Sequence, residues 1–110
     1  MNEIKQPCRM YCANFQLYIK WLFRFGPRGA QTVDRRGYIE GLTSVLKFAK
    51  IITEDQENMI LRELFTVQCK HKEAVSQSKT KGEIDTIARG MVYETEKHIK
   101  TIFENKEESR

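Results

Sequence analysis

Residues 53–67, TEDQENMILRELFTV, decide the fold that this sequence predicts. Thr53 and Gln56 have the spacing of a capping box, in which each side chain accepts a hydrogen bond from the other residue's backbone N–H. Acidic residues follow in the first turn, where the helix dipole favours negative charge. Apolar residues then recur at helical spacing. The expected core face comprises Ile60, Leu61, Leu64, Phe65 and Val67. The stretch therefore predicts a helix that begins at Thr53.

A second helix is predicted directly before this one, over residues 34–50. Its expected N-cap is Thr32 or Asp34, because both side chains accept hydrogen bonds from a free first-turn N–H. The expected buried stripe comprises Tyr38, Ile39, Leu42, Val45, Leu46 and Ala49. Since very few residues separate this helix from Thr53, we expect the two helices to form a tight antiparallel hairpin.

Two further helices flank this hairpin. Residues 9–25 carry a wide apolar face opposite a polar one, and Gly26-Pro27 ends the pattern. Residues 76–81 are predicted to form a solvated loop. Thr80 and Glu83 repeat the capping-box spacing and open a helix that extends to about residue 105.

The four predicted helices indicate one all-α domain over residues 1–110. We expect a compact bundle of about four helices, because amphipathic helices with short links bury their apolar faces against one another. We also expect the ends, at residues 1–8 and 106–110, to be flexible.

Positive charge is concentrated in the first fifty residues, whose nine bases and three acids give a net charge of +6. The remaining sixty residues carry ten bases and twelve acids, a net charge of −2. This asymmetry favours an anionic partner, either nucleic acid or a nucleoprotein complex. The predicted contact residues are Lys20, Arg24, Arg28, Arg35, Arg36 and Lys47. The same arginines would also suit a solvated connector that packs over helix ends.

The aromatic residues of the first helix give an alternative interpretation. If Tyr18 and Trp21 are exposed, they would suit a protein–protein inhibitor or adaptor, for which a homodimer is one option. The core of a four-helix protein would need the same aromatic face. The sequence leaves open whether this helix is core or interface.

Metal binding and catalysis have little support in the sequence. Cys8, Cys12, Cys69 and His71 are a permitted zinc set by residue type. However, Cys-x3-Cys is not the usual zinc-knuckle spacing, and residues two apart on a helix point to different sides. The sequence also contains no HExxH or GxSxG motif. We expect no metal, no cofactor and no enzymatic activity, and therefore a regulatory or accessory binding protein.

We expect neither a secretory signal nor a membrane-spanning segment. No apolar run follows the first charges, and the longest apolar stretch is interrupted by Gln16, Lys20 and Arg24. The odd number of cysteines, three, suits a reducing compartment better than a disulfide framework. We expect a cytoplasmic protein with no membrane partner.

Overall fold

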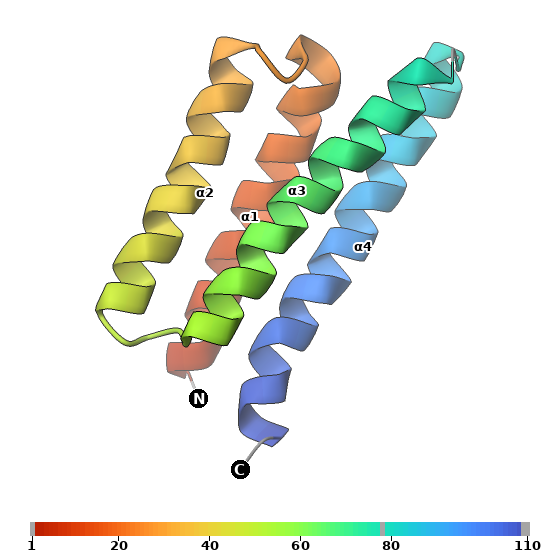
Figure 1. Cartoon of the computed structure of the whole chain (residues 1–110). Helices are drawn as coiled ribbons and strands as arrows, with labels where there is room; N and C mark the ends of the chain where they lie inside the picture. The colour runs from red at the N-terminus through yellow and green to blue at the C-terminus, as the bar shows by residue number, and fades with distance from the viewer. Residues whose placement is uncertain (1, 78, 109–110) are drawn as a thin grey trace.

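Four α-helices form an up-down-up-down bundle in the computed structural model, which describes the backbone of residues 2–77 and 79–108 and the side chains of 6–77 and 79–104. The helices are α1 (Asn2–Phe25), α2 (Ala30–Phe48), α3 (Glu54–Ser76) and α4 (Lys81–Glu108). As Figure 1 shows, α1 lies beside α2 and α4, and α3 completes the bundle between the same two neighbours. The predicted all-α bundle and its α2–α3 hairpin are confirmed.

The first helix begins earlier than predicted. It starts at Asn2 and continues through Pro7, which is buried. A proline at this position removes one helical hydrogen bond, but its fixed φ is compatible with a helix. The predicted flexibility of residues 1–8 and 106–110 stays untested, and residues 1, 109 and 110 lie outside the described part of the chain.

The second helix also begins earlier, and its predicted N-cap is wrong. Gly29 is the N-cap and makes no side-chain capping bond. Thr32 is instead inside the helix, where it is 1% exposed and its hydroxyl donates to the backbone carbonyl of Trp21 at 3.0 Å. Its side chain therefore joins α2 to α1 rather than capping α2.

Both predicted capping boxes are present. The Gln56 N–H donates to Thr53 Oγ1 at 3.1 Å, and the Thr53 N–H donates to Gln56 Oε1 at 2.9 Å. Thr80 and Glu83 repeat this exchange at 2.9 and 3.2 Å. The hydrogen bonds from Thr80 lower the pKa of the Glu83 carboxyl group, because they stabilise its charged form. The sequence therefore located the starts of α3 and α4 correctly.

The apolar face of α1 forms the centre of the core. Its largest members, which are at most 1% exposed, are Tyr11, Phe15, Tyr18, Ile19 and Leu22. The Tyr11 ring stacks on Phe103 of α4 with ring centroids 5.9 Å apart, and its hydroxyl lies 2.9 Å from Thr43 Oγ1 of α2. One face of α1 thus packs against both of its neighbouring helices, α2 and α4.

Five residues predicted to face the core are exposed instead, one of which is Ala49, the C-cap of α2. Tyr38 and Val45 of α2 are 49% and 62% exposed, and Leu61 and Phe65 of α3 are 37% and 65% exposed. Each helix at the corner of a four-helix bundle is covered mainly by its two neighbours. The predicted stripes were therefore wider than the surface that these neighbours cover.

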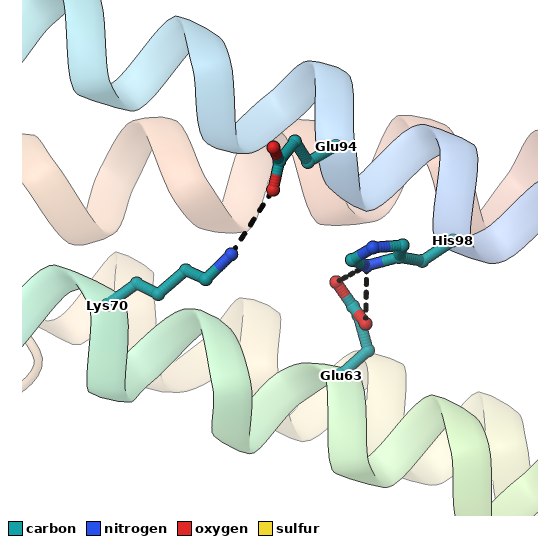
Figure 2. A network of polar contacts seen from close by, with 4 residues as sticks. All are labelled: Glu63, Lys70, Glu94 and His98. Carbon is teal, nitrogen blue, oxygen red and sulfur yellow. Dashed lines mark hydrogen bonds and ion pairs between the residues drawn. The ribbon is translucent and has the colours of Figure 1, made fainter.

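Two polar contacts join α3 to α4, as Figure 2 shows. Lys70 Nζ lies 3.3 Å from Glu94 Oε1, and both side chains are substantially exposed. His98 Nδ1 lies 3.0 and 3.1 Å from the two carboxylate oxygens of Glu63. The Glu63 side chain is only 11% exposed. Loss of its partner His98 should therefore destabilise the protein more than loss of Lys70, the partner of the exposed Glu94.

We expect His98→Ala to lower the free energy of unfolding by about 1–3 kcal/mol, because it leaves a largely buried carboxylate without a partner. Lys70→Ala is the matched control on the same interface. It should cost less than about 1 kcal/mol, since exposed ion pairs contribute little. Urea unfolding followed by circular dichroism measures the free energy of unfolding of both variants. Equal losses in the two variants would contradict this prediction.

The link between α1 and α2 requires glycine at two positions. Gly26 has a φ of +85°, in the left-handed region that glycine adopts without strain. A Cβ atom at Gly29 would lie 2.6 Å from Phe25 Cβ and 3.0 Å from the Phe25 carbonyl oxygen. The end of α1 and the start of α2 therefore approach more closely than a side chain at Gly29 allows.

We expect Gly29→Ala to destabilise the protein, because the added methyl group collides with the end of α1. Gly90→Ala is the control, since Gly90 lies inside α4 with no atom within 4 Å of the added Cβ. It should stabilise the protein by about 1 kcal/mol through helix propensity. Thermal unfolding distinguishes the two, and a stabilising Gly29→Ala would show that the link is looser than described.

Candidate functional site

A groove of about 960 Å³ lies between α1 and α4, at the end of the bundle where α1 stops and α4 begins. This end is at the top of the view in Figure 1. The apolar lining consists of Ile19, Phe23, Ile84, Ala88 and Val92. The polar lining consists of Gln16, Lys20, Arg24, Lys79, Lys81, Asp85 and Arg89. The groove thus combines an apolar surface with five cations and one carboxylate.

Helical spacing places these charges along two lines. On α1, Lys20 and Arg24 are four residues apart and therefore share one side of the helix. On α4, Lys81 and Arg89 are two turns apart on one side, with Asp85 between them. Because α1 and α4 are antiparallel neighbours, the two lines face one groove.

The five groove cations make no ion pair or hydrogen bond through their side chains with another described residue. The Arg24 guanidinium instead lies 5.4 Å from the centroid of the Phe25 ring. The charge of Lys79 contributes to the lowered pKa of Glu83, which lies outside the groove lining. Clustered cations without partners create a positive potential that attracts anions.

A buried histidine supports the groove from within the bundle. The His71 ring is 7% exposed and meets Phe23 edge to face, with ring centroids 4.7 Å apart. Burial lowers the pKa of His71 from its ordinary value of 6.5, because desolvation disfavours the charged imidazolium. His71 is therefore a neutral packing residue at physiological pH.

The structure divides the cations predicted from the sequence. Lys20 and Arg24 line the groove, whereas Arg28 is exposed in the loop that follows α1. Lys47 lies at the other end of α2, where its Nζ is 3.4 Å from Glu57 Oε1. The predicted set is therefore not one surface.

The side chains of Arg35 and Arg36 point in different directions, because α2 begins before them and both residues lie inside the helix. Consecutive residues of a helix point about 100° apart. Arg35 Nη1 donates to Asn14 Oδ1 of α1 at 2.6 Å, and its guanidinium lies 5.4 Å from the Trp21 ring. Arg36 Nε lies 4.0 Å from Glu40 Oε2, too far for a hydrogen bond. Both residues are half-buried, but Arg35 is hydrogen-bonded to α1, whereas Arg36 is paired only with a residue of its own helix.

The sequence interpretation missed Lys79, Lys81 and Arg89, which supply the other half of the groove. It assigned the first two to a solvated loop and gave no role to the third. A signal was available, because an antiparallel bundle places the last turn of the first helix beside the first turns of the fourth. The summed charge of these two segments would have indicated a cationic surface at this end of the bundle.

The two aromatic residues predicted for partner binding differ in exposure. Tyr18 is 1% exposed, so the expectation that its side chain is available at the surface is wrong. Burial raises the pKa of its phenol, against smaller opposing effects of a hydrogen bond to Gln68 and the charge of Arg36. Trp21 is half-buried beneath Arg35, and part of its ring remains accessible. Tyr18 is therefore a core residue, and the question of an interface concerns Trp21 only.

The cysteines and His71 do not form a metal site. Among the described residues there is no group of three or more His, Cys, Asp or Glu side chains that could hold a metal ion. Cys8 and Cys12 are half-buried against the core, and Cys69 is exposed on α3. Burial raises the pKa of Cys12 to about 12, so its thiol is protonated at neutral pH.

Comparisons with known proteins give no match. The chain matches no protein-family model, and it is not significantly similar to any curated protein or solved structure. Within the described residues, none of the helices combines the length and the apolar character that crossing a lipid bilayer requires. The site is therefore interpreted from its own geometry.

The lowered pKa of His71 predicts a pH dependence of stability. A histidine that is harder to protonate in the folded state favours folding above pH 6.5, and this contribution is lost as the pH falls through the folded-state pKa. We expect the free energy of unfolding to fall below pH 6.5 by at most about 1.4 kcal/mol per pH unit from this proton.

Urea unfolding of the wild type and of His71→Gln between pH 7.5 and 5 would measure this dependence, with pH values chosen around the ordinary histidine pKa of about 6.5. The variant should show a smaller pH slope whatever its absolute stability. Identical slopes would show that His71 titrates normally in the folded protein.

Proposed function

We propose that this protein is a non-enzymatic, cytoplasmic accessory or regulatory protein that binds an anionic partner, nucleic acid or a nucleoprotein complex, in the groove between α1 and α4. The observation that carries this proposal is the presence of five cations without described partners around one groove that contains a single carboxylate, Asp85. Such a cluster is unfavourable alone, and a polyanion relieves its repulsion while releasing condensed counterions.

The mixed lining of the groove supports nucleic acid in particular. Lysine and arginine side chains from two helices can follow a phosphate backbone. Apolar side chains such as Phe23 and Val92 provide a surface for bases or sugars between the charges. Binding of this kind depends on charge and stacking, and we expect little sequence preference.

Binding is a better assignment than catalysis for this groove. Its described lining includes no histidine, cysteine or serine, and its one carboxylate is Asp85. General acid–base or nucleophilic chemistry requires a positioned pair of such groups. The nearby His71 is packed behind Phe23 and does not line the groove.

A second candidate function is an inhibitor or adaptor that contacts another protein through Trp21. The supporting observation is that Arg35 lies 5.4 Å from the Trp21 ring and 5.1 Å from the Tyr38 ring. Tryptophan, tyrosine and arginine dominate the binding energy of many interfaces. Binding through this cluster should respond weakly to salt, whereas groove binding should weaken steeply.

The groove proposal predicts a loss of nucleic-acid binding in the double variant Lys79→Glu/Lys81→Glu. We expect affinity for a labelled single-stranded oligonucleotide to fall at least about tenfold at low salt, because two phosphate contacts become repulsive. The slope of log affinity against log salt should also decrease by about one for each lysine lost. Fluorescence anisotropy over a salt series measures both quantities.

The matched control is Arg62→Glu/Lys72→Glu, which changes the net charge by the same amount on the exposed side of α3. Neither residue lines the groove. The affinity of this control variant for the oligonucleotide should stay close to that of the wild type. Equal losses in the two variants would mean that only net charge matters, and undetectable binding by the wild type would exclude nucleic acid as the partner.

A further inference from the structure

A second surface, on the outer side of α2, resembles one half of a helix–helix interface. Tyr38, Gly41, Val45 and Phe48 follow one another at steps of three, four and three residues. This is the 3.5-residue spacing of a coiled-coil seam. The three large side chains are 49%, 62% and 91% exposed. We call these four residues the α2 seam.

The monomer does not use the α2 seam for its own core. The residues that α2 buries in the bundle are Thr32, Ile39, Thr43 and Leu46, on the opposite side of the helix. Leaving large apolar side chains in water forgoes about 1.5–3 kcal/mol for each one that a partner could bury. Apolar residues at seam spacing are stabilising only when another helix covers them.

We propose that the α2 seam docks on the α2 seam of a second copy of this chain, with the two helices antiparallel. Shape favours this pairing. The seam has a large side chain at each end, Tyr38 and Phe48, with Gly41 and Val45 between them. A Cβ atom at Gly41 would meet nothing within 4 Å, so the backbone there is open.

A two-fold axis level with position 43 brings the two seams together along their length. It places Val45 of each copy opposite Gly41 of the other, so that a large side chain meets an open backbone, and it sets Tyr38 opposite Phe48. Close approach of helices at glycine also increases the area that the two copies bury. A parallel arrangement would instead set Phe48 against Phe48 and Val45 against Val45, and it would leave Gly41 facing Gly41 without packing.

Charge also favours the antiparallel pairing. Asp34 and Lys50 lie near opposite ends of α2, are exposed, and have no ion pair with another described residue. In the antiparallel arrangement Asp34 of one copy comes within about two residues of Lys50 of the other, twice per dimer. The helix dipoles also oppose each other favourably. A parallel pair would place like charges together.

The expected dimer is weak and leaves the groove free. One helix from each copy covers less than the roughly 800 Å² per partner of a standard interface. We therefore expect a dissociation constant of about 10–100 μM. The groove lies between α1 and α4, and α2 is not part of it, so dimerisation does not depend on the proposed nucleic-acid binding.

Sedimentation velocity over a range of protein concentrations tests this proposal with the full chain. The wild type should shift from the monomer to twice its mass as concentration rises. Phe48→Glu should weaken dimerisation at least about 100-fold, because each dimer loses both of its contacts between Phe48 and Tyr38. Val75→Glu, at another exposed apolar residue of α3, should leave dimerisation unchanged.

A charge exchange tests the antiparallel register. Asp34→Lys and Lys50→Asp should each weaken the dimer, and the double variant should restore it, because the pairs re-form with reversed sign. Aspartate is tolerated at position 50, where φ is +64°. A wild type that stays monomeric up to about 1 mM, where no useful affinity remains, overturns the proposal. A dimer that is insensitive to Phe48→Glu, or a double variant without rescue, also overturns it.

Discussion

Burial of the aromatic face of α1 is the constraint on which the rest of the structure depends. Tyr11, Phe15 and Tyr18 are almost completely inaccessible and occupy the space between the other helices. Because α1 must turn this face inward, Lys20 and Arg24 are directed to its margin, beside the first turns of α4. The groove is therefore a consequence of how the core is filled.

Local sequence signals predicted the elements well, because their causes are local. The capping boxes at Thr53 and Thr80 each need only two residues three positions apart, and both were found at the predicted places. The start of α2 was missed because Thr32 bonds to the Trp21 carbonyl on another helix. No pattern within α2 itself reports that partner.

The site was less predictable, because it combines segments about sixty residues apart in the chain. Charge asymmetry identified Lys20 and Arg24 but grouped them with Arg35, which the bundle uses to bind Asn14. Periodicity likewise assigned Tyr38 and Val45 to the core, although the corner position of α2 leaves them exposed. Both differences between prediction and structure arise from which helices are neighbours in the bundle. A single sequence reveals these neighbours only once the topology of the fold is known.

Two surfaces of the protein differ in the physics of their expected contacts, a cationic groove between α1 and α4 and an apolar seam on α2. Amide hydrogen exchange with and without single-stranded nucleic acid tests the central claim most directly, because bound segments gain protection. We predict added protection in the last turns of α1 and the first turns of α4, with little change along α2. Protection confined to α2 and α3, or none at any nucleic-acid concentration, would contradict the account.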